Sequence, residues 1–329
     1  MEVEPSDVPV SETSKEPFEL AHTISLHKGP ISCVKYSSDG DYLAIATADK
    51  SIAVYQTSDY TCCHRFEGHD EGVNAVSWSP TSNYLVSCSD DKTIRVWDVK
   101  QGKLVRVITD LSHFPTCIAV NPRGTIVACS CVDNHIYFFS LFTRSLLKTI
   151  YAHSNTITSI SFNTDGSWLV SSSVDGYCRI WDCESGNCIK TKHPTHDTTP
   201  IISASFSPND KYVLLSYLKK GLAVWCLEHD RIEQLEYDHH VVDQYICNSL
   251  FYNIGANYLL TGSENGKIVL YAIEGKNVFE LSCCDEVVLC VDYSRTTGDI
   301  AAGTMGERNE VLVMKRRSLC VSCKAQEMD

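Results

Sequence analysis

The sequence predicts an all-β fold: a seven-bladed β-propeller whose last blade is closed by an N-terminal strand. Two observations support this prediction, a period of 42 residues in the first half of the chain and short apolar runs separated by turn residues. The repeat begins with four aspartates that each precede an aromatic residue by six positions: Asp49, Asp91, Asp133 and Asp175. A sustained period of about 40–45 residues is typical of propeller blades.

The aromatic partners carry the repeat through the rest of the chain. They are Tyr55, Trp97, Phe139, Trp181, Trp225 and Tyr271, with Met314 in the same place in the last copy. The spacing loosens after the fourth copy, because Trp225 follows Trp181 by 44 residues and Tyr271 follows Trp225 by 46. Seven copies therefore fit between residues 17 and 316.

Each copy predicts one four-stranded blade and no long helix. In the second copy, the runs GVNAVSWSP (72–80), YLVSCS (84–89) and TIRVWD (93–98) are rich in β-branched and aromatic residues. Turn residues separate such runs, as in SDGD at 38–41 and NTDG at 163–166. One blade cannot bury both of its faces alone, so the blades are expected to pack in a ring.

The repeat divides the chain into three parts. We expect a disordered acidic segment at 1–16, the propeller at 17–316 and a tail at 317–329. The strand that completes the last blade is expected in FELAHTISL, residues 18–26. The propeller should therefore depend on residues close to the N-terminus.

Composition argues against several classes of protein. The net charge of -13 disfavours binding of nucleic-acid phosphates through bulk charge. The 17 cysteines are odd in number and scattered, many within apolar runs, which favours free thiols in a reducing intracellular compartment. The sequence has no run of 18 apolar residues that predicts a membrane span, and its N-terminal segment has no apolar core typical of a signal peptide.

Motifs for catalysis or cofactor binding are missing from the sequence. It has no phosphate-binding glycine loop and no G-x-S-x-G element, so we expect no cofactor and no enzymatic activity. The single C-x-x-C at Cys320–Cys323 lacks the second pair that a structural zinc site needs. Histidines gather at His193 and His196 and at His239 and His240, where a metal site is the weaker alternative to blade and loop histidines.

With these repeats the chain resembles the WD40-repeat proteins over about 300 residues. In that family a His, a Ser or Thr, an Asp and a Trp of one repeat tie the strands of a blade by hydrogen bonds. Two blades carry complete sets of these structural ties: His69, Ser87, Asp91, Trp97, His153, Ser171, Asp175 and Trp181. The later blades depart from the pattern, with Lys219, Asn265 and Arg308 in the aspartate place. A catalytic acid would not recur at a fixed period, so we interpret Asp91 and Asp175 as structural.

Four longer segments resemble a narrower family, the WD-repeat scaffold subunit of histone H3 lysine methyltransferase complexes of the trithorax/MLL/COMPASS type. They are VSCSDDKTIRVWDV (86–99), AHSNTITSISFNTDGSWLVSSSVDGYCRIWD (152–182), SASFSPNDKYVLL (203–215) and YLLTGSENGKIVLY (258–271). The resemblance is weakest in the seventh blade, so the chain is expected to be a divergent relative.

In that family an arginine of a partner or histone peptide enters the central channel and stacks between two phenylalanines. The resemblance and the repeat place the corresponding partner-binding residues at the channel mouth: Ala48, Asn74, Asp90, Thr116, Val132, Thr158, Val174, Tyr245 and Asn248. Thr116 and Val132 occupy the places of the two phenylalanines, while Val174 replaces a tyrosine and Asn248 a further phenylalanine. We therefore expect arginine capture to be weakened or retargeted.

The same family uses a groove on the opposite face for another subunit of the complex. Carried over to this chain, its partner-binding residues are Asn209, Tyr212, Val224, Gln234 and Glu274. Gln234 replaces a lysine and Glu274 a glutamine, so the groove should be more acidic and less suited to a partner chosen for a basic groove. Purely structural roles for Asn209 and Tyr212 are the alternative.

We interpret the chain as a non-enzymatic interaction scaffold of a histone H3 methyltransferase complex. The resemblance implies a monomeric propeller that binds protein subunits and a histone tail peptide in the nucleus, with the cytoplasm as the alternative, and without direct contact with nucleic acid or membrane. The second hypothesis is that the chain is a substrate receptor of a ubiquitin ligase. It is disfavoured because WDVK (97–100) and WDCE (181–184) lack the Trp-Asp-x-Arg signature common in that class.

Overall fold

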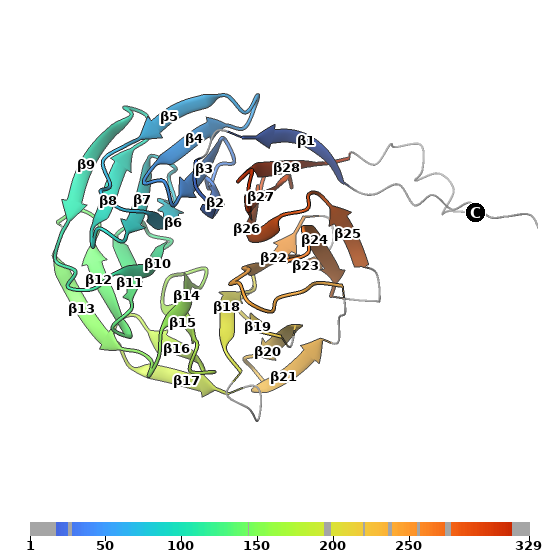
Figure 1. Cartoon of the computed structure of the whole chain (residues 1–329). Helices are drawn as coiled ribbons and strands as arrows, with labels where there is room; N and C mark the ends of the chain where they lie inside the picture. The colour runs from blue at the N-terminus through green and yellow to red at the C-terminus, as the bar shows by residue number, and fades with distance from the viewer. Residues whose placement is uncertain are drawn as a thin grey trace, which may run out of the picture.

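The computed structural model describes residues 18–25, 28–143, 145–193, 199–219, 221–235, 239–254, 257–273 and 278–317. These residues form 28 β-strands in seven four-stranded antiparallel sheets, which surround a common centre (Figure 1). The predicted all-β, seven-bladed propeller is confirmed. Within this part of the chain, no helix is long and apolar enough to cross a membrane.

Each of the first six blades consists of four consecutive strands paired in chain order. Blades one to three contain β2 Ile31–Tyr36, β3 Tyr42–Thr47, β4 Ile52–Gln56, β5 Cys62–Phe66, β6 Val73–Trp78, β7 Tyr84–Ser89, β8 Ile94–Asp98, β9 Lys103–Ile108, β10 Pro115–Val120, β11 Ile126–Cys131, β12 His135–Ser140 and β13 Leu146–Tyr151. Blades four to six contain β14 Ile157–Phe162, β15 Trp168–Ser173, β16 Cys178–Asp182, β17 Cys188–Lys192, β18 Ile201–Phe206, β19 Tyr212–Tyr217, β20 Gly221–Cys226, β21 Arg231–Leu235, β22 Ser249–Asn253, β23 Asn257–Gly262, β24 Lys267–Ala272 and β25 Val278–Ser282.

The seventh blade combines both ends of the described chain. Its strands are β26 Val287–Tyr293, β27 Ile300–Met305, β28 Val311–Arg316 and β1 Phe18–Ile24, and β1 pairs with β28 from Phe18 opposite Arg316 to Ile24 opposite Val311. The predicted closure by an N-terminal strand is confirmed. The predicted segment 1–16, the tail beyond Arg317 and the repeat histidine His27 lie outside the described residues.

Burial follows strand position within a blade. The second strand is covered on both faces by the neighbouring blades, so in β7 the five residues after Tyr84 are all buried. Such a strand reads as a short continuous apolar run rather than an alternating one. The fourth strand lies at the rim (Figure 1), and the first three residues of β9 are exposed.

The hydrophobic core is divided among the interfaces between blades. One cluster joins Ala44 and Ile52 of the first blade to Val76 and Leu85 of the second. Another cluster includes Ile24 of β1 together with residues of the first blade, across the point where the ring closes. Each blade is therefore stabilised by the two blades beside it, as expected for a repeat fold.

The strand directions define two faces. Loops that join successive blades, and turns between the second and third strands of a blade, lie on what we call the mouth face. Turns between the first and second strands, and between the third and fourth, lie on the groove face. The first strands of the blades lie nearest the centre of the ring (Figure 1).

Deletion of residues 17–26 is expected to destabilise the whole propeller, whereas deletion of residues 1–15 should have little effect. The first deletion removes β1, exposes the edge of β28 and removes the buried Phe18, whose loss alone costs about 3–5 kcal/mol. A fall in melting temperature of about 10 °C is expected for this deletion. Equal melting temperatures for the two truncated proteins would show that β1 does not hold the ring closed.

Candidate partner-binding surfaces

The four predicted tie residues of the second blade form a chain of hydrogen bonds. His69 Nδ1 lies 2.7 Å from Asp91 Oδ2, and His69 Nε2 lies 2.8 Å from Ser87 Oγ. Trp97 donates its indole N–H to the same Ser87 oxygen at 2.9 Å. Since the carboxylate accepts from Nδ1–H, Ser87 donates to Nε2. Every polar side-chain atom of the four tie residues therefore has a partner.

The fourth blade repeats this arrangement. His153 Nδ1 is 3.1 Å from both carboxylate oxygens of Asp175, and its Nε2 is 2.7 Å from Ser171 Oγ. The Trp181 indole donates to Ser171 Oγ at 2.9 Å. These bonds connect the loop before the blade to its second and third strands.

Electrostatics keep each tie in one protonation state. Burial lowers the pKa of both His69 and His153, so the imidazoles stay neutral. Burial opposes ionisation of Asp91, but hydrogen bonds from Thr93 and His69 outweigh it and lower the pKa of the carboxyl group. A neutral imidazole beside an ionised carboxylate, both fully bonded, is a structural group that has no free proton acceptor for catalysis.

The sixth and seventh blades use different contacts in place of the tie. In the sixth, His240 Nδ1 lies 2.7 Å from the Tyr271 hydroxyl, and burial lowers the pKa of His240 to about 4. In the seventh, Glu286 accepts from the Thr304 hydroxyl at 2.9 Å and from the backbone N–H of Arg308 at 2.6 Å. The sixth blade thus keeps a histidine bonded to its aromatic residue, whereas the seventh uses the carboxylate of Glu286, a residue type that the repeat pattern does not contain.

Side chains near the start of the first strands connect neighbouring blades on the mouth face. They donate hydrogen bonds of 2.5 to 3.1 Å to backbone carbonyls of the next blade, from Ser32 to Val73, Asn74 to Pro115, Thr116 to Ile157 and Thr158 to Ile201. Asn248 makes the same kind of link, donating to Val291 O at 2.9 Å and accepting from Val291 N at 2.6 Å. Four predicted mouth residues therefore already hold the ring together.

Other predicted mouth residues are available to solvent. Ala48 and Asp90 are exposed and Val174 is half-buried, and Asp90 accepts a 2.7 Å hydrogen bond from Asn74. Val132 has 40% of its surface exposed.

Phe114, which the sequence reasoning missed, lies beside Val132. Its carbonyl accepts the Val132 N–H at 3.0 Å, and its exposed ring lies 5.1 Å from the Lys92 ammonium group. The mouth thus carries an apolar edge near two of the positions predicted for partner binding.

A single carboxylate organises the loop that carries Tyr245. Glu264 Oε1 accepts the backbone N–H groups of Asp243, Gln244 and Tyr245 at 2.7, 2.7 and 2.8 Å. This arrangement leaves the side chains of Tyr245 and Ile246 exposed on the mouth face. The loop is therefore positioned by its backbone, while its side chains remain free to contact a partner.

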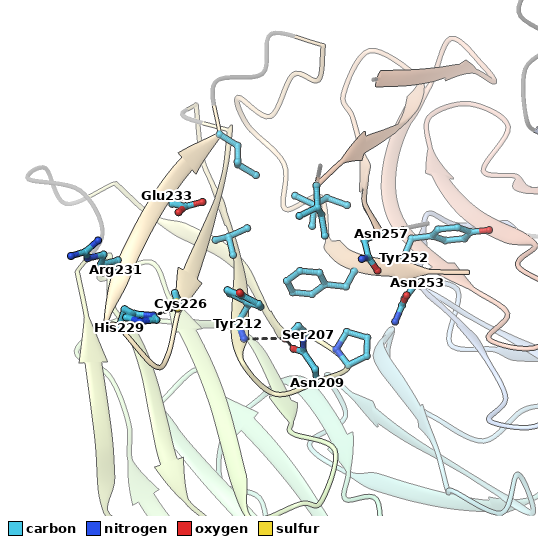
Figure 2. A pocket seen from close by; sticks show the side chains of 16 residues that line it. Ser207, Asn209, Tyr212, Cys226, His229, Arg231, Glu233, Tyr252, Asn253 and Asn257 are labelled. Carbon is cyan, nitrogen blue, oxygen red and sulfur yellow. Dashed lines mark hydrogen bonds between the residues drawn. The ribbon is translucent and has the colours of Figure 1, made fainter. Parts of the chain in front are cut away.

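A pocket of about 720 Å³ lies on the groove side, between the fifth and sixth blades (Figure 2). Asn209, Tyr212 and Val224 line it. The turn before β19 positions two of these residues, since Ser207 Oγ accepts the Tyr212 N–H at 3.0 Å and donates to Asn209 Oδ1 at 2.7 Å. Three of the predicted groove residues therefore line one pocket.

Of the other two predicted groove residues, only Gln234 lies within the described part of the chain. Gln234 lies between Glu233 and Leu235, which both line it, and the alternation of side chains along β21 turns Gln234 to the other face of the strand. Gln234 is therefore not among the residues that line this pocket, and its role in partner binding stays a prediction. Glu274 lies outside the described residues.

Sequence reasoning also missed one wall of the pocket. Phe251 and Leu259 of the sixth blade supply apolar surface, and Tyr252, Asn253 and Asn257 belong to that same blade (Figure 2). A search within single repeats cannot find a wall that another blade contributes.

Charged and nucleophilic side chains were missed on the fifth blade. Cys226, His229, Arg231 and Glu233 all line the pocket. The departure at Cys226 is visible in the sequence, because this residue occupies the place where the complete repeats have the aspartate of Trp-Asp.

The histidine clusters and the cysteines singled out in the sequence do not form a metal site among the described residues. His239 Nδ1 lies 2.5 Å from Glu280 Oε1, and His193 packs against Tyr177 with ring centroids 4.7 Å apart. In the part of the chain that the structure describes, the cysteines are free thiols, and no group of three or more His, Cys, Asp or Glu side chains could hold a metal ion. His196 and Cys320–Cys323 lie outside that part.

Comparison with protein-family models matches residues 23–315 to the WDR5 beta-propeller domain. The chain belongs to the WDR5 β-propeller family. Among curated proteins, none matches the sequence at a significant level. Membership of the WDR5 family confirms the family-level resemblance predicted from the repeats. The WDR5 family is generally non-catalytic and implies protein partners, while the individual mouth and groove residues remain predictions.

Ser87→Ala is expected to lower the free energy of unfolding by about 2–4 kcal/mol, because it leaves both His69 and Trp97 without their buried partner. Ser216→Ala is the matched control. Ser216 is a buried strand serine whose hydroxyl has no hydrogen-bond partner among the described residues, so its loss should change stability by less than about 0.5 kcal/mol. Denaturant unfolding measures both values, and equal effects would contradict the structural role of the tie.

Proposed function

We propose that this WDR5-family propeller is a non-catalytic scaffold subunit of a histone H3 methyltransferase complex in the nucleus. It would bind another protein subunit in the groove-side pocket and a peptide, such as a histone tail, on the mouth face. The observation that carries the proposal is the convergence of Asn209, Tyr212 and Val224 in one pocket of about 720 Å³.

The pocket suits an extended segment with apolar side chains. Its apolar surface comes from both blades, including Val224, Leu235, Phe251 and Leu259, and burying apolar surface contributes about 25 cal/mol per Å². Tyr212 is 38% exposed, so its ring can contact such a segment without unfolding the strand. The asparagine side chains at the groove face can pair with a partner backbone, which gives orientation as well as affinity.

The mouth face supports a changed peptide preference. Thr116 and Asn248 present no ring to stack on a guanidinium group, and their polar atoms bond to the neighbouring blades. Exposed apolar side chains are present instead, on Phe114, Val132 and Ile246. Asp90 remains exposed, and the net charge of -13 favours a basic partner. We therefore propose that the mouth binds peptides with less dependence on a stacked arginine.

Affinity purification of the tagged protein from its own cells tests the scaffold role. Methyltransferase-complex subunits should co-purify with the wild-type protein, and those bound through the pocket should be lost with Tyr212→Ala, which removes an exposed ring. Asp90→Ala on the opposite face is the control and should retain them. If no methyltransferase subunit is recovered and another reproducible set appears, the proposed complex is wrong.

Titration with an arginine-containing histone H3 tail peptide tests the mouth. Binding should be at least about tenfold weaker than for a scaffold with both phenylalanines, since each lost stacking contact is worth about 1–2 kcal/mol. The double variant Thr116→Phe, Val132→Phe should bind the peptide more tightly, and Tyr212→Ala should not change its affinity. Wild-type affinity equal to that of the phenylalanine-containing scaffold would contradict the proposal.

A further inference from the structure

The residue after the repeat aromatic residue accepts a turn amide in three blades. It is an aspartate in the second and fourth blades, and in the third it is Ser140, whose hydroxyl accepts the Thr143 N–H at 3.1 Å. In the second blade, Asp98 Oδ1 accepts the backbone N–H of Gln101 at 2.8 Å. In the fourth blade, Asp182 Oδ1 accepts the backbone N–H of Ser185 at 2.6 Å. The turn between the third and fourth strands thus directs the amide three residues later towards a side-chain oxygen at this position.

In the fifth blade this position holds a thiol. Cys226 ends β20 directly after Trp225, and His229 lies three residues later in the turn that follows. The His229 imidazole contacts the thiol, with Nδ1 3.5 Å from Cys226 Sγ. The next residue is fixed, because Asp230 accepts the Trp225 indole N–H at 2.9 Å. The turn therefore holds the sulfur beside the imidazole of His229.

These contacts favour the thiolate. The backbone N–H and imidazole of His229 lower the pKa of Cys226, and the thiol in turn raises the pKa of His229. Burial has the opposite effect elsewhere in the protein, where it raises the pKa of Cys183 and Cys247 to about 12. Cys226 is half-buried and free, so a small reagent can reach it.

The sulfur faces the pocket between the fifth and sixth blades. Cys226 pairs with Tyr212 on one side and with Arg231 on the other, and all three side chains line the pocket (Figure 2). The charged or titratable groups among the described lining residues are Tyr212, Cys226, His229, Arg231, Glu233 and Tyr252. The wall contributed by the sixth blade carries asparagine, apolar and tyrosine side chains, so the cations lie on the same wall as the sulfur.

We propose that Cys226 and His229 form a reactive thiol site that couples with small disulfides, and that the attached group blocks the pocket. The Cys226 thiolate attacks one sulfur of a low-molecular-weight disulfide. A new S–S bond forms, the original one breaks, and the second half leaves as a thiolate that takes up a proton. Cys226 is oxidised and the small disulfide is reduced. The reactivity of Cys226 does not depend on the proposed function, whereas the effect on a partner rests on it.

Alkylation of the full-length protein with iodoacetamide measures the reactivity. Peptide mass spectrometry compares Cys226 with Cys188, an exposed thiol at the rim. Cys226 should label about fivefold faster at pH 6, because its larger thiolate fraction outweighs the lower nucleophilicity of a more acidic thiol. Its pH–rate profile should have its midpoint below that of Cys188. Equal rates and midpoints would overturn the proposal.

Two variants separate reactivity from folding. His229→Gln should raise the midpoint of the Cys226 profile and reduce its rate at pH 6, and an unchanged profile would overturn the role of the imidazole. Cys226→Asp restores the carboxylate found in the second and fourth blades, so its melting temperature should match that of the wild-type protein. It should no longer form an adduct with oxidised glutathione at this position.

Oxidised glutathione tests whether the adduct blocks the pocket. Wild-type protein carrying one glutathione at Cys226 should lose the partners that Tyr212→Ala loses, dithiothreitol should restore them, and Cys226→Ser should be unaffected. Retention of those partners by the modified protein would overturn the blocking. If untreated protein has no Tyr212-dependent partner, the proposed function fails, and the alkylation profile still decides the reactivity.

Discussion

Pairing of β1 with β28 is the constraint on which the rest of the molecule depends. Each blade buries its faces only against its two neighbours, so an open ring would leave the first and seventh blades with exposed apolar surface. Pairing of six of the seven β1 residues with β28 converts a linear series of repeats into a ring. The positions of both faces follow, because every loop is set by the strands that the closed ring fixes.

On the mouth face, residues predicted to bind a peptide also connect neighbouring blades. The side chains of Asn74, Thr116 and Thr158 each donate to a carbonyl of the next blade. A phenylalanine at position 116 could not make that bond, whereas threonine adds a link across the blade interface. This chain therefore has a polar connection at a position where the family resemblance implies an aromatic surface. Exposed apolar side chains of the mouth face are those of Phe114, Val132 and Ile246.

The sequence was sufficient to predict the blades but only part of the surfaces. The period located the ring, its closing strand and the ties at His69 and His153, because these depend on residues at fixed separations within one repeat. Asn209 and Tyr212 could be placed through the family resemblance. The pocket wall at Phe251 and the carboxylate of Glu286 could not, because each acts on a partner that the repeat pattern does not specify. The direction of the Gln234 side chain also required the observed strand, because Glu233 and Leu235 on either side of it line the pocket.

The fifth blade differs from the second and fourth blades in the contacts that hold its tryptophan and the residue after it. The second and fourth blades carry complete ties, so a change at His69 or Asp175 would leave buried polar groups without partners. The fifth blade instead anchors Trp225 on Asp230, a residue at the end of a surface turn. Cys226 itself is held by backbone pairing to Tyr212 and Arg231. Like Asp98 and Asp182 at the same place in the complete repeats, it takes no part in bonding the indole. The contacts of His229 lower the pKa of Cys226. Under the proposed reactivity, this would place a thiolate in the pocket at the position where the complete repeats have a carboxylate.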